Sequence, residues 1–464
     1  MALYKQDDIL TLNVVSYGMD GEGVAKENGY VFFIPFAIVG ERVTVKVLHV
    51  NKKNLVFCEL KEVITPSPLR VKPECNRFGR CGGCDLSHIQ YEEQLKIKRD
   101  NVVNLFRKNA GIETEIDETV PCSVPFGYRN KIQLPFGTVN GEVKMGFFKE
   151  GTHKIVAITK CFLHGAWAED LIDVFTAFAR EHKLTAYDDG TKKGLLRHMV
   201  ARVTDGGFCI VVVTNGERLP FVDDLVKRLN ARIGDNYALF NSVKKEHDNV
   251  ILGKTMIPLR EKKTTASVLG VAMEINPYSF LQLNDEIRDK IYSRIIDEVC
   301  ERGVSGKTVI DAYAGVGALG AVLAKRGATV FNVEIVKEAT DDGNKLIQNN
   351  GLTDKVTNIN GDAALVVPEL MEKLTKQGVV DPVIILDPPR KGCDERVLNA
   401  ISALQTPHTL YYISCNPATL TRDLKYLLSR GYEICYVSPY DMFPNTKHVE
   451  TLVQLSHKIP DKSS

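Results

Sequence analysis

A cysteine ends an apolar run in the stretch LYYISCNPATL, residues 410–420, directly before an Asn-Pro dipeptide that must turn the chain. A lone buried cysteine usually only fills space as a small hydrophobe. The run before Cys415, however, has the β-branched and aromatic bias of a buried strand, and the cysteine falls where that strand stops. Strand ends form the ligand crevice of open α/β sheets, so this position favours a thiol that acts on a ligand.

A glutamate near the C-terminus could supply the second group of a reaction centre. Glu450 stands in SPYDMFPNTKHVETLVQL, between a loop rich in turn residues and a strand-like run. A glutamate there is by base rate a solvated surface group. A thiol and a carboxylate in one cleft would instead suit methylation at carbon 5 of a pyrimidine. The thiolate adds at carbon 6, carbon 5 becomes able to take a methyl group, and a base removes the proton left there. We therefore predict Cys415 as nucleophile and Glu450 as base.

A glycine loop predicts a nucleotide-like cofactor. VIDAYAGVGALG follows a strand, opens a helix and contains the spacing G-x-G-x-x-G, with glycines at 315, 317 and 320. Taken alone, the pattern indicates a dinucleotide site in which Glu334, at the end of the next strand, holds a ribose. S-adenosylmethionine enzymes use the same geometry, and Asp311 favours them because an anion would repel a pyrophosphate. VIILDPPRKG places Asp387 in the same crevice, where a nicotinamide site has no need of it. A nicotinamide site and an unliganded turn are the alternatives.

The elements that must position these residues form an α/β domain. From residue 276 onward, strand-like and helical stretches alternate, which predicts a doubly wound, Rossmann-like parallel sheet with helices on both faces. Residues 1–63 show short strands separated by turns, the pattern of a small OB-like β-barrel. Residues 64–275 are mixed and predict a central α+β domain.

Four of the eleven cysteines suggest a metal site. CNRFGRCGGC gives Cys75, Cys81 and Cys84, and Cys161 could supply a fourth ligand from a distant strand. Such a set can hold zinc or a [4Fe-4S] cluster, and the spacing alone does not separate the two. His88 and Cys122 are nearby alternatives. A disulfide framework is not expected, because cytosolic reductants keep thiols reduced.

Composition excludes little else. The net charge of +1 gives no global signal for nucleic acid, so an RNA-binding protein of this composition would have to gather its cations on one face. The start of the chain carries acidic residues where a signal peptide would carry basic ones, and the longest apolar stretch is too short to span a bilayer. We expect a cytoplasmic protein without a membrane segment, and a monomer.

Three motifs in order, DPPRKG, YYISCNPAT and YDMFPNTKHVE, resemble those of the RNA uracil-5-methyltransferase family, which uses S-adenosylmethionine. With the upstream segments the resemblance spans nearly the whole chain. It implies Cys415 as nucleophile and Glu450 as base. It also implies a cofactor pocket formed by Gln282, Tyr313, Gly315, Glu334, Asp362 and Asp387. In that pocket Asp362 would contact the adenine, and Asp387 would lie near the target base as well. Asn445 stands where the family more often has Gln, His or Tyr, and Ala318 where some members have a polar residue. We interpret both as tuning of the pocket.

The resemblance extends to the branch of the family that methylates 23S rRNA. That branch carries a [4Fe-4S] cluster with this cysteine spacing, and the first 63 residues resemble a TRAM domain. Such barrels bind single-stranded nucleic acid through aromatic side chains on which bases stack and through nearby cations. Candidates for these roles are Tyr17, Tyr30, Phe32, Phe33, Arg70, Lys72, Arg77 and Arg80. A tRNA enzyme, a nicotinamide-dependent iron-sulfur oxidoreductase and a non-catalytic RNA-binding chaperone are the alternative functions.

Overall fold

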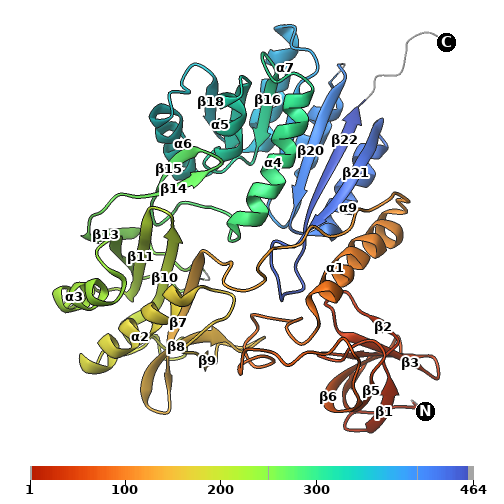
Figure 1. Ribbon diagram of the computed structural model, residues 1–464, viewed down its shortest axis with the longest axis vertical. Coiled ribbons are helices and arrows are strands. Elements are labelled where there is room, and N and C mark those ends of the chain that lie inside the picture. The colour runs from red at the N-terminus through yellow and green to blue at the C-terminus, as the bar shows by residue number, and fades with distance from the viewer. Residues whose placement is uncertain (1–2, 249, 405, 458–464) are drawn as a thin grey trace.

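The computed structural model describes residues 3–248, 250–404 and 406–457 and contains three large sheets (Figure 1). The C-terminal sheet has the strand order β18-β17-β16-β19-β20-β22-β21. Its strands are β16 (Thr308–Ala312), β17 (Thr329–Glu334), β18 (Val356–Asn360), β19 (Val383–Leu386), β20 (His408–Ser414), β21 (Tyr432–Tyr440) and β22 (Glu450–His457). The first five are parallel, and β22 runs antiparallel to both of its neighbours. The chain order reverses between β16 and β19, and such a reversal opens a ligand crevice at the carboxyl ends of the strands.

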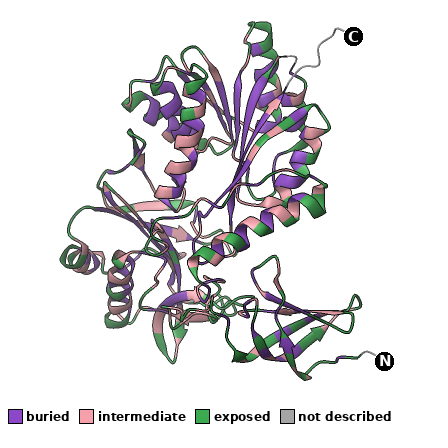
Figure 2. Cartoon of the chain, turned by 45° about the vertical axis from the view of Figure 1, so that its right-hand side comes forward, coloured by how far each residue is buried: buried purple, intermediate pink, exposed green. Residues whose placement is uncertain are grey.

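Helices cover both faces of this sheet. They are α4 (Asp285–Glu301), α5 (Ala318–Lys325), α6 (Lys337–Asn349), α7 (Ala363–Lys376), α8 (Glu395–Ser402) and α9 (Pro417–Leu428). Successive strand residues point to opposite faces, so Val309 packs with α4, α5 and α6, whereas Ile310 packs with α7, α8 and α9. Figure 2 shows the middle strands of this sheet buried, and β19, β20 and β22 are buried along almost their whole length, whereas the edge strands β18 and β21 carry exposed residues. The predicted doubly wound α/β fold is confirmed.

The N-terminal sheet has six strands in the order β1-β5-β6-β4-β3-β2. They are β1 (Ile9–Asn13), β2 (Ser16–Tyr17), β3 (Gly23–Glu27), β4 (Tyr30–Ile34), β5 (Arg42–Val50) and β6 (Leu55–Thr65). Alternate residues of β5, Val43, Val45 and Val47, are fully buried in its small core, which is the period expected of a half-buried strand. The short strands predicted for residues 1–63 are present, and closure into a barrel stays a prediction.

The central segment of the chain combines one sheet with two helices, as predicted for an α+β segment. The strand order of this sheet is β13-β12-β11-β10-β7-β8-β9. Its elements are β7 (Lys131–Val139), β8 (Glu142–Phe148), β9 (Ile155–Ala157), α2 (Ala166–Glu181), β10 (Leu196–Thr204), β11 (Gly207–Asn215), α3 (Val222–Ile233), β12 (Tyr237–Lys244) and β13 (Thr255–Arg260). A hairpin of β14 (Thr264–Val268) and β15 (Val271–Ile275) follows and packs into the core that contains α5 and α6. The proposed boundaries at residues 63 and 275 stay predictions.

One helix joins the N-terminal sheet to the C-terminal one. Helix α1 (Tyr91–Leu105) continues into a short π-helix, η1 (Phe106–Ala110), and lies between the two sheets (Figure 1). Val102 and Phe106 are buried in the same core as α7, α8 and α9. The side of α1 turned away from that core is exposed (Figure 2). Among the residues that the structure describes, no helix has the length and apolar character needed to cross a membrane.

Candidate active site

Cys415 and Glu450 meet at one edge of the C-terminal sheet. The last residue of β20, Ser414, pairs with Thr451 of the antiparallel strand β22. Cys415 and Glu450 are the next residues beyond that pair, so the end of one strand places the thiol beside the start of the other. The Glu450 side chain is buried, with 2% of its surface exposed. The alternative of a solvated surface glutamate is therefore wrong.

The charges around the thiol oppose its ionisation. Burial raises the pKa of Cys415 to about 11, the nearby Glu450 and Asp387 carboxyls add to the rise, and the Arg390 cation reduces it. Burial also raises the pKa of Asp387 to about 7. Burial raises the pKa of Glu450 well above its ordinary value, with Asp387 adding to the rise and Arg390 opposing it. The thiol of the free protein thus keeps its proton near neutral pH, and two carboxyl groups lie within electrostatic reach to accept it.

The Asn-Pro dipeptide after the cysteine fixes the turn. Asn416 caps α9, because its Oδ1 accepts a hydrogen bond from the N–H of Ala418 (3.1 Å) and Pro417 occupies the start of the helix. The same side chain donates from Nδ2 to the Arg390 carbonyl (3.0 Å), and the Thr419 hydroxyl donates to that carbonyl as well (3.2 Å). These bonds tie the thiol-bearing turn to the loop that carries Asp387.

A pocket of about 280 Å³ opens at Cys415. Arg390 and Lys447 contribute cations to its wall, α1 contributes Asn101, and the turn between β2 and β3 contributes Met19 and Asp20. The N-terminal sheet therefore helps to enclose the thiol, a contact that no local pattern in the sequence indicates. A larger hollow of about 750 Å³ lies between α8 and α9 and is lined by neither Cys415 nor Glu450.

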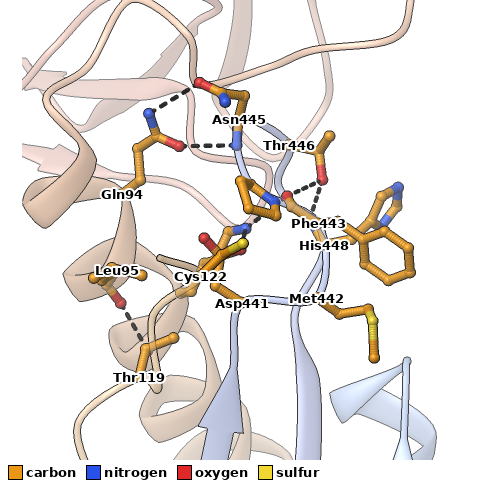
Figure 3. Close-up of polar contacts among 12 residues, drawn as sticks. Gln94, Leu95, Thr119, Cys122, Asp441, Met442, Phe443, Asn445, Thr446 and His448 are labelled. Atoms are coloured by element: carbon orange, nitrogen blue, oxygen red, sulfur yellow. Dashed lines mark hydrogen bonds and ion pairs between the residues drawn. The ribbon is translucent and has the colours of Figure 1, made fainter. Parts of the chain in front are cut away.

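The loop leading to Glu450 is held by its neighbours through Asn445. This residue has φ 67°, a left-handed conformation that asparagine tolerates better than most residues. Its N–H donates to Gln94 Oε1 (3.0 Å), its Nδ2 donates to the Pro125 carbonyl (2.8 Å), and its own carbonyl accepts from the N–H groups of Asp85 and Leu86 (3.1 Å each). Figure 3 shows Gln94 of α1 facing Asn445. With 3% of its surface exposed, Asn445 anchors the loop.

A buried ion pair holds the start of the same loop. The Lys98 ammonium of α1 contacts the Asp441 carboxylate, and neither side chain is exposed. Lys98 also donates to the Phe443 carbonyl (2.9 Å), and the Tyr91 hydroxyl donates to Asp441 Oδ2 (2.8 Å). Burial lowers the pKa of Lys98, whereas the Asp441 charge opposes that change. Sequence reasoning missed this pair, because neither residue stands in a recognisable motif.

The predicted cofactor side lies at the reversal point of the sheet. Glu334, at the end of β17, accepts a hydrogen bond from the Gly315 N–H at Oε2 (2.9 Å) and one from the Val336 N–H at Oε1 (2.8 Å). Asp311 is buried at the end of β16, and burial together with the Asp387 and Glu334 charges raises its pKa well above the ordinary value. Gly317 has φ 75°, and a Cβ there would come within 2.2 Å of the Asn332 amide. The glycine loop and the acid predicted to bind a ribose are therefore in contact.

The remaining predicted cofactor residues are more spread out. The Gln282 carbonyl accepts from Asn130 Nδ2 (2.9 Å) just before α4. Tyr313 takes φ 68° in the glycine loop, and burial and the Cys393 thiol raise its pKa. Asp362 caps α7, accepting from the Ala364 N–H (3.0 Å). Large apolar side chains near this edge stand exposed to solvent, namely Phe280, Ile335 and Leu365. Cofactor contacts of these residues stay predictions.

Cys75, Cys81, Cys84 and Cys161 line a single cavity of about 30 Å³, to which Arg129 also contributes. Burial raises the pKa of Cys84 to about 12 and that of Cys161 to about 11, and the Arg129 cation opposes both shifts. Cys122, named as an alternative ligand, instead donates to the Val124 carbonyl (3.2 Å). Within residues 3–248, 250–404 and 406–457, no group of three or more His, Cys, Asp or Glu side chains is arranged to hold a metal ion. Ligation by the four cysteines stays a prediction.

The predicted RNA-binding residues have mixed environments. Phe32 is fully buried in the N-terminal core, whereas Phe33 is half-buried and stacks on the more exposed Phe57, with ring centroids 5.5 Å apart. Arg70 forms an ion pair with the buried Glu41 (2.5 Å). Phe32 and Arg70 therefore serve the fold, and RNA contacts of Phe33 and the other candidates stay predictions.

Comparison with known proteins identifies the class. A family model described as tRNA (Uracil-5-)-methyltransferase matches residues 270–458. An uncharacterised RNA methyltransferase of Clostridium tetani is 35% identical over 98% of this chain and 97% of its own length. A similarly named protein of Listeria monocytogenes is 35% identical over 98% of this chain and 99% of its own. The crystal structure of Pyrococcus abyssi tRNA (uracil-54, C5)-methyltransferase in complex with S-adenosyl-L-homocysteine superimposes with a TM-score of 0.75, at 26% identity over 96% of this chain and 99% of that one.

The doubly wound sheet, its glycine loop and these matches define an S-adenosylmethionine-dependent RNA methyltransferase. Among the alternatives, the oxidoreductase and the non-catalytic chaperone are therefore excluded as the principal function. The chain belongs to the RNA uracil-5-methyltransferase family.

Proposed function

We propose that this protein transfers a methyl group from S-adenosylmethionine to carbon 5 of a uridine in 23S ribosomal RNA, through a covalent bond between Cys415 and carbon 6 of the uracil. The observation that carries the proposed reaction is the placement of Cys415 beside Glu450 at the sheet edge, with Asp387 in electrostatic reach of both, whereas the choice of 23S ribosomal RNA rests on the resemblance to that branch of the family. A nucleophile and a base in one buried site are the two groups that this reaction needs.

The chain's own residues account for the steps of the reaction. The Cys415 thiol loses its proton to a neighbouring carboxylate, and the sulfur lone pair forms the bond to carbon 6. The displaced ring electrons move to carbon 5 and the carbonyl oxygen at carbon 4, and carbon 5 then takes the methyl group. Glu450 removes the proton from carbon 5, and those electrons rebuild the ring double bond as the carbon–sulfur bond breaks. The sulfur leaves as a thiolate and takes back the proton held by the neighbouring carboxyl group, and Glu450 releases the carbon 5 proton to solvent, which restores the enzyme.

The residues at the carboxyl edge of β16 and β17 suit S-adenosylmethionine, which when bound supplies an electrophilic methyl group on a sulfonium. Glu334 would hold the ribose hydroxyls, because its carboxylate already lies against the glycine loop. The exposed apolar side chains of Phe280, Ile335 and Leu365 would cover the adenine, with Asp362 at its edge. Gln282, Tyr313 and Asp387 complete the proposed pocket. Supporting this assignment, the Pyrococcus relative is described as a complex with S-adenosyl-L-homocysteine.

We also propose that the four cysteines hold a [4Fe-4S] cluster in a central domain of residues 64–275, between a TRAM-like barrel of residues 1–63 and a methyltransferase domain of residues 276–464. The convergence of Cys75, Cys81, Cys84 and Cys161 on one cavity supports the ligand set. The Arg129 cation would stabilise the thiolates that such a cluster needs. Iron and sulfide analysis of protein purified without oxygen tests it: Cys84→Ser should lose the iron and Cys209→Ser, a buried cysteine elsewhere, should keep it.

A transfer RNA is the second candidate substrate. The Pyrococcus structure is that of a tRNA enzyme and covers 96% of this chain, so the N-terminal and cysteine-bearing segments do not by themselves favour ribosomal RNA. Either substrate would be met in the cytoplasm. The target uridine must leave its stack to reach the thiol, which favours loops and other single-stranded regions in both RNAs.

One experiment tests both substrates. Ribosomal and transfer RNA are isolated separately from a strain that lacks the gene and incubated with the purified protein and labelled S-adenosylmethionine. Label in the 23S fraction, mapped to 5-methyluridine, supports the proposal, and label only in the tRNA fraction supports the second candidate. No label in either fraction rejects both. The Cys415→Ala variant is the control, because it should transfer no methyl group.

A further inference from the structure

Lys447 lies where the N-terminal sheet meets the pocket at Cys415. Its ammonium is 3.2 Å from Asp20 Oδ1, on the turn between β2 and β3. Its backbone N–H donates to Asp85 Oδ2 (3.0 Å), in the segment that follows the cysteines. The same turn is held to α1, because Asn101 Nδ2 donates to the Met19 carbonyl (3.0 Å). Lys447 therefore stands at a junction of three parts of the chain, on the rim of the thiol pocket.

Positive charge gathers around this pocket. Burial lowers the pKa of His448 to about 4, and the charges of Arg390, Lys447, Lys98 and Arg129 lower it further. The acids that face Lys447 are Asp20, Asp85 and Glu150, which all act to raise its pKa. Asp20 is the partner in ion-pair contact, and 67% of its side chain is exposed against 28% for Lys447.

We propose that Lys447 binds an RNA phosphate next to the target uridine, and that Asp20 occupies this cation until RNA displaces it. The inference rests on the proposed function, because a flipped uridine at Cys415 brings its flanking phosphates to the rim of the pocket. A lysine ammonium is a suitable point charge for a phosphate. An ion pair whose carboxylate is largely exposed, as that of Asp20 is, contributes little stability, so a polyanion can replace the carboxylate. The turn at Asp20 is then part of the substrate entrance.

This arrangement predicts opposite effects for its two partners. Lys447→Gln removes the phosphate contact and should raise the KM for RNA about tenfold while leaving kcat nearly unchanged. It should also make the dependence of log Kd on log salt shallower by about 0.7, the contribution of one neutralised phosphate on a single strand. Lys447→Arg keeps the cation and should retain the wild-type slope. Asp20→Asn removes the competitor and should tighten RNA binding about threefold.

The experiment measures RNA binding from 50 to 200 mM salt, together with KM and kcat, on the RNA that the wild-type protein methylates. Lys376→Gln, at an exposed position of α7 far along the chain from the pocket, controls for the loss of one positive charge. The proposal is overturned if Lys447→Gln changes the salt slope no more than Lys376→Gln does, or if Asp20→Asn weakens binding. Failure of the proposed function would look different: the wild-type protein itself would transfer no methyl group to any RNA.

Discussion

Glu450 is the first residue of β22 and Cys415 is the residue after β20, so the two occupy the next positions beyond Ser414 and Thr451, the last pair of that ladder. The register of two antiparallel strands thus places the thiol and the carboxyl at one sheet edge, although they come from separate motifs. Residues opposite each other on neighbouring strands project to the same side, so strand pairing brings the thiol and the carboxyl to one side of the sheet.

Glu450→Gln should trap the enzyme on its RNA. The amide cannot accept the proton on carbon 5, so the methylated ring stays bonded to Cys415 and turnover falls about 10²- to 10⁴-fold. In denaturing gel electrophoresis with S-adenosylmethionine and substrate RNA, a protein–RNA band that resists denaturation should appear. Glu369→Gln, at an exposed position of α7, is the matched control and should turn over normally. A variant that methylates at the wild-type rate would remove Glu450 from the role of base.

The reactivity of Cys415 should keep rising with pH beyond the range of an ordinary thiol. Only the thiolate reacts with iodoacetamide, and with a pKa of about 11 its fraction grows about tenfold per pH unit between pH 8 and 10. A small-molecule thiol instead levels off above its pKa of about 8.5. Mass spectrometry of the peptide that contains Cys415 measures the rate. Because Arg390 lowers this pKa, Arg390→Gln should slow alkylation at pH 8, and a faster rate would contradict the assigned electrostatics.

Asp311 should make the free protein less stable as the pH rises. Its pKa in the folded state is raised, so above an unfolded-state value of about 3.9 the unfolded chain releases a proton that the folded protein retains. Stability therefore falls with increasing pH up to the folded-state pKa, by at most about 1.4 kcal/mol per pH unit. In Asp311→Asn this part of the slope is absent.

Thermal unfolding between pH 5 and pH 8, without cofactor, measures the difference. The slope in Asp311→Asn should be shallower than in the wild type but not zero, because Asp387 and Glu450 also have raised pKa values. Asp354→Asn, at an exposed position, should keep the wild-type slope. Identical slopes in all three proteins would show that the buried Asp311 does not lower the stability of the fold as the pH rises.

Local patterns predicted the parts of the site that lie on single strands and turns. Glu334 ends a strand and Cys415 and Asp387 directly follow one, and strand ends can be recognised from β-branched runs that stop at Gly, Pro or Asn. A parallel sheet brings the carboxyl ends of all its strands to one edge, so local sequence patterns are sufficient to predict that these residues lie near one another. The same local patterns do not decide whether Glu450 is a solvated surface group or a buried base, because its burial depends on strands far apart in the sequence.

Contacts between distant segments could not be predicted in this way. Lys98 and Asp441 are separated by 343 positions, and nothing in either neighbourhood marks an ion pair. The difference from the family pattern predicts that Asn445 tunes the pocket, whereas its left-handed backbone and its bonds to Gln94 and Pro125 give it an anchoring role. Such roles depend on tertiary packing and leave no periodic signal in the sequence.

Asn445 should resist replacement for two separable reasons. Asn445→Gly keeps the left-handed backbone at no steric cost but loses the side-chain bond to the Pro125 carbonyl. Asn445→Ala loses the same bond and also strains the backbone, so it should cost about 1 kcal/mol more than the glycine variant. Urea unfolding followed by fluorescence compares the two, and methyl transfer should fall in the same order. Equal stability of the two variants would show that the left-handed conformation is unimportant there.

Lys98→Met should leave Asp441 as an uncompensated buried charge. Neither side chain is exposed, and breaking one partner of a buried pair typically costs about 3–5 kcal/mol. Since Lys98 also bonds the Phe443 carbonyl, the loop that leads to Glu450 should loosen, and methyl transfer should fall together with stability. Replacing both partners, as Lys98→Met with Asp441→Leu, also removes the unpaired buried carboxylate and should recover most of the stability.

The double variant separates the two roles of the pair. Apolar replacements can restore packing, but they cannot donate to the Phe443 carbonyl or accept from the Tyr91 hydroxyl, so the loop should remain misplaced. We therefore expect near wild-type unfolding by urea, and continued weak methyl transfer with faster proteolytic cleavage between residues 441 and 449. Recovery of full activity along with stability would mean that the pair serves the fold alone, and that the position of Glu450 is set by its strand pairing with Tyr440.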